Sequence, residues 1–164
     1  MAIIIAGFAT CGKSVLGRKY RNVIDLESSS YKYKVFDTDL TFEQRKGTKR
    51  EKNDKWPQNY YNAINEACKK YDVVLVQLKP EHFNYFDKNN IKYSIAYPNL
   101  DNWNEVERRC IERGNNEGFI IRLKQVFKPY YEDSLKRKCE KMYILNNKET
   151  LEDCLIKDNI KLIK

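Results

Sequence analysis

A glycine-rich segment, GFATCGKS from Gly7 to Ser14, has the composition and spacing of a phosphate-binding loop. Glycines at both ends would let backbone N–H groups approach phosphate oxygens closely. Lys13 can reach the β and γ phosphates of a nucleotide, and the hydroxyl of Ser14 can ligate Mg²⁺. We therefore predict a nucleoside triphosphate site here rather than a chance glycine turn. The predicted nucleotide-binding residues in this segment are Gly7, Phe8, Ala9, Thr10, Cys11, Gly12, Lys13, Ser14 and Val15.

Two arginines further along the chain could act on the same phosphates. Arg109 and Arg113 are four residues apart in ERRCIERG, so on a helix they share a face. Phosphoryl transfer needs cations that stabilise the transferring group. The alternative is a solvated surface helix on which these arginines pair with Glu105 and Glu112. The predicted catalytic residues are Lys13, Arg109 and Arg113.

The segment that follows these arginines can serve as a lid. Gly114 and Gly118 bracket a short polar tip, and such a tip can act as a hinge. Arg122 comes one turn later and is predicted to lie beside the substrate. We therefore predict a lid over residues 108–122 that excludes water from the reaction.

Carboxylates follow a short apolar run at residues 22–26. Asp25 would lie at the carboxyl edge of a parallel sheet, where ligands of such folds bind. We predict that Ser14 and Asp25 form the Mg²⁺ site and that Glu27 contacts the acceptor. Helix capping or solvation is the alternative for both carboxylates. His82, with no metal-ligating neighbours in the sequence, is predicted to be structural.

Other nucleotide-dependent classes fit the sequence less well. The stretch NNKE (146–149) resembles the guanine-reading pattern N-K-x-D but lacks its aspartate. A motor-type ATPase usually has a carboxylate at the end of a buried strand, and VVLVQLK places Gln77 and Lys79 there. Both observations favour a kinase over a nucleotide hydrolase.

Apolar runs alternate with amphipathic stretches along the whole chain. This alternation predicts an α/β fold with a mostly parallel sheet and helices on both faces. The expected strands are 3–6, 22–26, 73–78, 91–97 and 142–145, and residues 28–30 are expected to form a turn. The expected helices are 13–20, 57–71, 80–87, 101–113, 119–138 (bent near Pro129) and 150–157. We predict one domain over residues 1–164, with a mobile basic segment on the acceptor side at about 41–56.

Bulk composition limits the choice of partners. The net charge of +8 favours anionic ligands, without distinguishing nucleotides from nucleic acid. No apolar run is long enough for a membrane span, and the first residues do not form a signal peptide. The five cysteines show no metal or disulfide spacing, and Cys11 is expected to be a neutral filler rather than a reactive thiol. We therefore expect a cytoplasmic protein (host cytoplasm if phage-encoded), as a monomer or homodimer.

Several segments together resemble one enzyme family. They are GFATCGKSVLGRKY, VIDLESSSY, KWPQNYYNAI, VVLVQLKPEHF, YSIAYPNLDNWNEVERRCIERGNNEGFI and YILNNKETLEDCL. In this order the chain resembles the small P-loop nucleoside monophosphate kinases, in particular a compact adenylate-kinase-like group of phages and Gram-positive bacteria. The resemblance implies a three-layer α/β/α P-loop fold with a five-stranded parallel sheet in the order 2-3-1-4-5. It also implies ATP with Mg²⁺ as donor and a (deoxy)nucleoside monophosphate as acceptor.

The resemblance also assigns residues. It implies that Asn146 lies beside the adenine, and that Asp25, Glu27 and Ser28 lie near the acceptor, as does the region 56–60. One departure is QLKPEH, which replaces the family's D-G-F-P-R after the third strand. Arg45 and Arg50 are the candidates for the missing acceptor-phosphate arginine.

Two other functions remain open at this stage. One is a kinase for another hydroxyl, such as a nucleoside, a metabolite or a nucleic-acid 5′ end, for which the basic run 41–55 is the support. The other is a non-catalytic, nucleotide-binding regulatory protein on the same fold. The small-molecule kinase is the function that the arginine pair favours.

Overall fold

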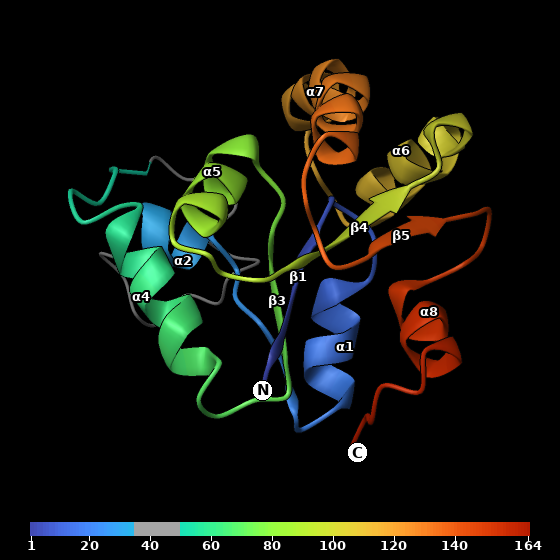
Figure 1. Cartoon of the computed structure of the whole chain (residues 1–164). Helices are drawn as coiled ribbons and strands as arrows, with labels where there is room; N and C mark the ends of the chain where they lie inside the picture. The colour runs from blue at the N-terminus through green and yellow to red at the C-terminus, as the bar shows by residue number, and fades with distance from the viewer. Residues whose placement is uncertain (35–49) are drawn as a thin grey trace.

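Short apolar runs form a sheet through the middle of the molecule. In the computed structural model, which describes residues 1–34 and 50–164, all strand pairs are parallel and the order is β2-β3-β1-β4-β5. The strands are β1 (Ile3–Gly7), β2 (Val23–Asp25), β3 (Val73–Gln77), β4 (Ser94–Pro98) and β5 (Met142–Leu145). The predicted fold class and strand order are therefore confirmed. Because all strands run the same way, the ends of β1 to β5 meet at one carboxyl edge (Figure 1).

Helices cover both faces of this sheet and complete three layers (Figure 1). One face packs against α4 (Gln58–Ala67), α5 (Pro80–Lys88), α6 (Trp103–Glu112) and α7 (Glu117–Leu135), and the other against α1 (Lys13–Lys19) and α8 (Leu151–Lys157). The short helices α2 (Ser29–Lys32) and η1 (Leu100–Asn102) lie in the connections. The buried hydrophobic residues form two clusters, one on each face of the sheet. Successive side chains of β1 point to opposite faces, so Ile4 and Ala6 belong to one cluster and Ile5 to the other.

Several element boundaries differ from the sequence-based expectation; the predicted helices 57–71 and 119–138, for example, end at Ala67 and Leu135. The fourth strand begins at Ser94 rather than 91, because Asn90 takes a φ of 53° and turns the chain after α5. Residues 28–30 belong mostly to the helix α2 instead of a turn. Helix α7 already begins at Glu117, because the Asn116 side chain caps it by accepting from the Phe119 N–H at 2.8 Å. Gly118 is therefore inside α7 and does not bracket the tip.

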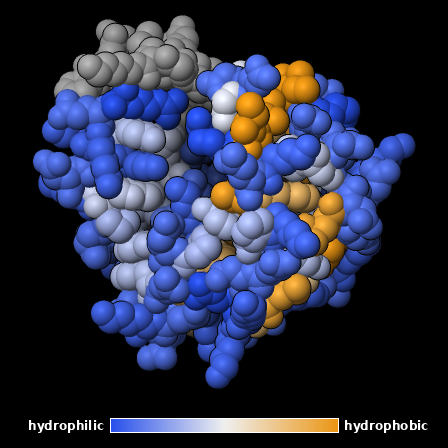
Figure 2. All heavy atoms as spheres, turned by 90° about the horizontal axis from the view of Figure 1, so that it is seen from above, coloured by the Kyte–Doolittle hydropathy of each residue, from blue (hydrophilic) through white to orange (hydrophobic). Residues whose placement is uncertain are grey.

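The remaining expectations concern the surface and the segment before α4. Within the described ranges, no helix has the length and apolar character needed to cross a bilayer. The face seen from above is largely hydrophilic, and its hydrophobic groups gather on one half (Figure 2). Most of the predicted acceptor-side segment, 41–49 with Arg45, lies outside the described residues.

Candidate nucleotide-binding site

The predicted phosphate-binding loop connects β1 to α1 at the carboxyl edge of the sheet. Its backbone uses conformations that few residue types accept, with φ of 95° at Gly12 and 67° at Thr10. Gly7 is required for a different reason, since a Cβ there would lie 2.6 Å from the Cys11 Sγ. The loop is therefore tightly built, and Gly7 and Cys11 fit together as a pair.

Some side chains of the loop are buried and pack against the core, and others are exposed to solvent. The Phe8 ring packs on Tyr97 and Phe127 at centroid distances of 4.7 and 5.4 Å, so only its backbone can serve a ligand. Cys11 is 1% exposed, and burial raises the pKa of its thiol. This supports the expected neutral filler, because a buried, protonated thiol is a poor nucleophile. Val15 is exposed on the first turn of α1.

Lys13 lies across the loop from which it arises. Its Nζ donates to the carbonyl of Gly7 at 2.8 Å and to that of Phe8 at 3.2 Å. The ammonium is thus held where the loop curves around it. An anion in the loop would meet a positive charge that is already in place.

Ser14 and Asp25 come from different elements and meet beside the loop. The Ser14 hydroxyl donates to Asp25 Oδ2 at 2.9 Å, while Asp25 Oδ1 is buried and has no hydrogen-bond partner among the described residues. Burial raises the pKa of Asp25, and the charge of Lys13 partly opposes this shift. Close packing brings the pair together, because a Cβ on Gly17 would lie only 3.0 Å from the Asp25 backbone nitrogen.

Among the described residues of the site, this pair offers oxygen atoms of the kind that a divalent cation takes as ligands. Oxygen ligands suit Mg²⁺, and an orphaned carboxylate oxygen beside a hydroxyl can accept such an ion. Within the described ranges, no group of three or more His, Cys, Asp or Glu side chains gathers as a metal site. Ser14 and Asp25 would therefore hold Mg²⁺ together with phosphate oxygens and water.

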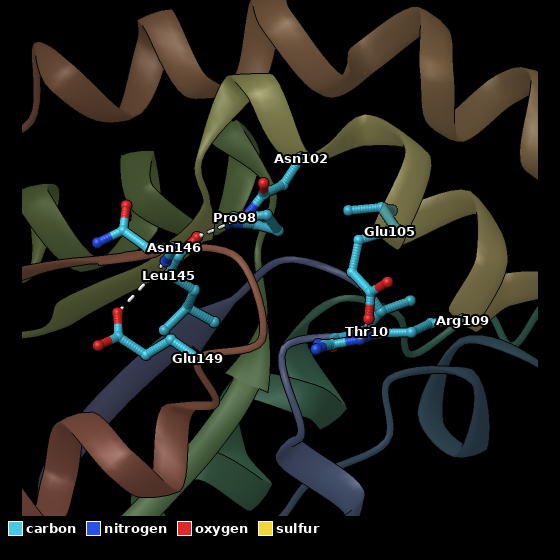
Figure 3. Close-up of a pocket in the computed structure, with 9 residues that line it drawn as sticks. Thr10, Pro98, Asn102, Glu105, Arg109, Leu145, Asn146 and Glu149 are labelled. Carbon is cyan, nitrogen blue, oxygen red and sulfur yellow. Dashed lines mark hydrogen bonds and ion pairs between the residues drawn. The ribbon is translucent and has the colours of Figure 1, made fainter.

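Arg109 links α6 to the loop. Its Nε donates to Glu105 Oε1 at 2.9 Å, and its Nη1 donates to the carbonyl of Thr10 at 3.0 Å. Arg108 also pairs with Glu105, but its side chain is 53% exposed against 24% for Arg109. Of the ion pairs in the alternative prediction, Arg109–Glu105 exists, whereas Glu112 pairs with Arg108. Arg109 in addition reaches the loop (Figure 3).

The other predicted lid residues lie further from the loop. Arg113 ends α6 and is exposed, yet its charge is close enough to lower the pKa of Asp25 slightly. Arg122 is exposed on α7, and in the described part of the chain no hydrogen bond or ion pair joins it to the loop. The tip between the helices turns at Gly114, where φ is 76°. The structure thus brings Arg109, but not Arg122, to the candidate site.

A small, shallow pocket opens on the β4–β5 side of the loop. It has room for about one water molecule, and Arg109 and Glu105 point into it from α6 (Figure 3). Asn146 lines the opposite wall, where its backbone N–H donates to Glu149 Oε1 at 3.3 Å. The complete lining is Thr10, Pro98, Asn102, Glu105, Val106, Arg109, Leu145, Asn146 and Glu149.

The β2 side of the loop is held by a buried tyrosine. The hydroxyl of Tyr60 donates to the carbonyl of Leu26 at 3.0 Å and accepts from the Gln77 N–H at 3.0 Å. Glu27 Oε1 accepts from the Ser29 N–H, at the start of α2, at 3.4 Å, a local contact of the kind that the helix-capping alternative describes. Ser28 is buried at the start of α2.

Sequence reasoning missed some of the residues that complete the site. Asn102 and Glu149 line the pocket without having been predicted, and Thr10, which was predicted, accepts a hydrogen bond from Arg109 that no local pattern indicates. His82 was correctly expected to be structural. It is 1% exposed, contacts the Tyr61 hydroxyl at 3.1 Å, and its pKa is lowered to about 4, chiefly by burial.

Comparisons with known proteins add no family to this description. No protein-family model matches the chain, and no curated protein matches it either. The kinase resemblance therefore remains a prediction from the residues themselves. The functional conclusion has to be drawn from the geometry of the loop, the Ser14–Asp25 pair and Arg109.

Proposed function

We propose that this chain is an ATP-dependent phosphotransferase whose acceptor is a (deoxy)nucleoside monophosphate. One observation carries the proposal: Lys13, the Ser14–Asp25 pair and Arg109 converge on a single loop from three separate parts of the fold. A loop that only bound phosphate would not need a guanidinium from α6 on its far side. A loop that takes part in phosphoryl transfer does need such a guanidinium, because negative charge develops on the transferring phosphoryl group in the transition state.

The donor nucleotide would lie along the loop with its base at the small pocket of Figure 3, whose walls would have to move apart to admit the base. Lys13 would exchange the carbonyls of Gly7 and Phe8 for phosphate oxygens. Arg109 stands between the pocket and the loop, so it can contact the nucleotide without a large movement. Asn146 would lie beside the base.

Mg²⁺ fits the Ser14–Asp25 pair, and when bound it would neutralise charge on the donor's phosphate oxygens. The chain's own contribution is to present a deprotonated carboxylate there. Burial raises the pKa of Asp25, so its ionised form depends on cations nearby, of which Lys13 is the foremost. Arg113, at the end of α6, would close the site from the lid side and exclude water.

The proposal is tested by turnover with purified protein, ATP, Mg²⁺ and a panel of ribo- and deoxyribonucleoside monophosphates. ADP formation should depend on one acceptor, and Lys13→Ala should lower kcat by about a hundredfold or more, as expected for removal of a group that stabilises developing charge. Arg109→Ala should lower kcat/KM, whereas the matched Arg108→Ala should leave it nearly unchanged, because Arg108 does not reach the loop. The kinase function fails if no acceptor yields ADP above background.

A non-catalytic nucleotide-binding regulator is the second candidate. The observation in its favour is the end of β3, where Gln77 stands at the position at which many ATP-hydrolysing proteins carry a carboxylate. Calorimetry separates the two candidates. Tight ATP binding that Lys13→Ala abolishes, together with no turnover on any acceptor, would establish the regulator.

A further inference from the structure

A glutamine ends β3 directly beside the phosphate-binding loop. The Cα of Gln77 pairs in register with that of Gly7, the first residue of the loop, on the neighbouring strand β1. The backbone N–H of Gln77 donates to the Tyr60 hydroxyl at 3.0 Å, which fixes the end of the strand. Gln77 therefore stands at the carboxyl edge of the sheet, at the level where the loop begins.

The side chain of Gln77 leaves the sheet on the same face as the Ser14–Asp25 pair. Val73 and Leu75 of β3 belong to the core cluster under α1, so Gln77, two residues further, starts on that face. Asp25 pairs in register with Leu75. The Asp25 and Gln77 side chains thus start about 5 Å apart across the strands and about 7 Å apart along them. An amide that starts there can reach a phosphate group held between the loop and the Ser14–Asp25 pair.

A histidine and a tyrosine hold the oxygen of this amide. His82 Nε2 lies 3.4 Å from Gln77 Oε1, and His82 Nδ1 lies 3.1 Å from the Tyr61 hydroxyl. Burial lowers the pKa of His82 to about 4, so at neutral pH its ring has one donor and one acceptor. Because the Gln77 oxygen can only accept, Nε2 carries the proton, and Nδ1 accepts from the Tyr61 hydroxyl.

Aromatic packing makes this support rigid. His82 and Tyr61 are 1% and 5% exposed, and the Tyr61 ring stacks on Tyr85 with centroids 3.8 Å apart. The Trp56 and Tyr60 rings pack against His82 at centroid distances of 5.8 and 5.4 Å. The amide oxygen is therefore held on the α5 side. Because the two ends of a carboxamide diverge, its NH₂ group is directed away from α5, over the sheet edge where the loop begins.

We propose that Gln77 contacts the nucleotide: its amide NH₂ donates a hydrogen bond to an oxygen of the terminal phosphate, and His82 and Tyr61 are positioning residues that aim it. This inference rests on the proposed function, and it gives a role to the amide at the end of β3. A carboxylate at this position would repel phosphate in the absence of a cation between them. An amide donates to phosphate with or without a divalent ion.

The test is calorimetric titration of ATP, once with Mg²⁺ and once with EDTA. Gln77→Ala should weaken ATP binding by about tenfold in both conditions, which is the scale of one hydrogen bond to a charged group. Gln77→Glu has the same size and should weaken ATP binding by more than about tenfold in EDTA. With Mg²⁺ its loss should be much smaller, because a divalent ion between the carboxylate and the phosphate attracts both.

Asn65→Asp is the matched control for the change of an amide to a carboxylate. Asn65 is exposed near the end of α4, far from the carboxyl edge of the sheet (Figure 1). This variant adds the same negative charge as Gln77→Glu and should bind ATP as wild type does in both conditions.

A second pair of variants tests the support of the amide. His82→Gln keeps a donor near the place of Nε2 and should bind ATP as wild type does. His82→Phe keeps an aromatic ring but has no donor, and it should weaken ATP binding by about threefold, the cost of ordering one freed side chain on binding. Thermal unfolding checks that both variants are folded. A merely structural histidine would change the Tm of these variants and leave their ATP affinity equal.

Two results would overturn the contact between Gln77 and phosphate. They are an unchanged ATP affinity in Gln77→Ala, and an equal loss with Mg²⁺ and with EDTA in Gln77→Glu. Equal ATP affinities of His82→Gln and His82→Phe would overturn the positioning role of His82. These measurements do not depend on turnover. A protein that binds ATP through Gln77 but forms no ADP on any acceptor would refute the phosphotransferase and leave this contact standing.

Discussion

Replacing Gly17 by alanine tests whether close packing of α1 on β2 builds the Ser14–Asp25 pair. In an ordinary helix this change stabilises a protein by about 1 kcal/mol. Here the new Cβ would lie 3.0 Å from the Asp25 backbone nitrogen and 3.1 Å from the Asp25 Cβ. Overpacking of this kind costs about 1–3 kcal/mol, so we expect a net loss of about 1 kcal/mol.

The clash can be relieved only if α1 moves away from β2, because the contact is with backbone. Ser14 is one turn before Gly17 on the same helix, so this movement lengthens the 2.9 Å hydrogen bond to Asp25. We therefore expect a higher KM for Mg-ATP and a Tm lowered by about 3 °C, since 1 kcal/mol corresponds to roughly 2–4 °C for a chain of this size.

The assays are thermal unfolding and steady-state kinetics at varied Mg²⁺, with Gly118→Ala as the matched control. At Gly118 the nearest atoms would be Arg122 Nη1 and Asn116 Oδ1, both at 3.5 Å, which is ordinary contact with side-chain ends. That variant should be as stable as wild type or more so, by up to about 1 kcal/mol. A Gly17→Ala protein with a raised Tm and unchanged Mg²⁺ dependence would refute the packing argument.

Three further changes have defined outcomes. Tyr60→Phe leaves the buried Leu26 carbonyl and Gln77 N–H without their shared partner, so denaturant unfolding should show a loss of about 1–3 kcal/mol; a loss below about 0.5 kcal/mol would contradict the bridge. His82 has a folded pKa of about 4 against 6.5 unfolded, so the unfolded state binds more protons and stability should fall as pH drops from about 6.5 to 4; His82→Gln should flatten this limb of the pH profile, and an unchanged limb would count against it. Glu105 has a pKa of about 2, lowered chiefly by the Arg108 hydrogen bond, so its contribution to the stability of the fold should be present above pH 4.5 and lost towards pH 2. Glu105→Gln should remove this fall in stability between pH 4.5 and 2, measured as Tm against pH.

The fold was predictable because its signals are local. Continuous apolar runs mark buried parallel strands, and the loop spacing marks the turn between β1 and α1. Strand order came from the resemblance rather than from periodicity, which carries no information on neighbours in a sheet. Boundaries shifted where one side chain decides them, as Asn116 does by capping α7.

The candidate site was predictable only where its residues are adjacent in sequence. Lys13 and Ser14 are fixed by the loop pattern, whereas the bond from Arg109 to the Thr10 carbonyl joins residues far apart in the chain. Arg122 illustrates the limit, because a position one turn after a glycine says nothing about the direction of its side chain.

The ammonium of Lys13 finds its hydrogen-bond acceptors inside its own loop, at the carbonyls of Gly7 and Phe8. Nucleotide binding, as proposed, would therefore exchange these acceptors for phosphate oxygens rather than add new ones. Its measured enthalpy would be the difference between two sets of charge-assisted hydrogen bonds. Under the proposed function, Lys13 could return to these two carbonyls when the nucleotide leaves, so the curved backbone would keep its internal hydrogen bonds.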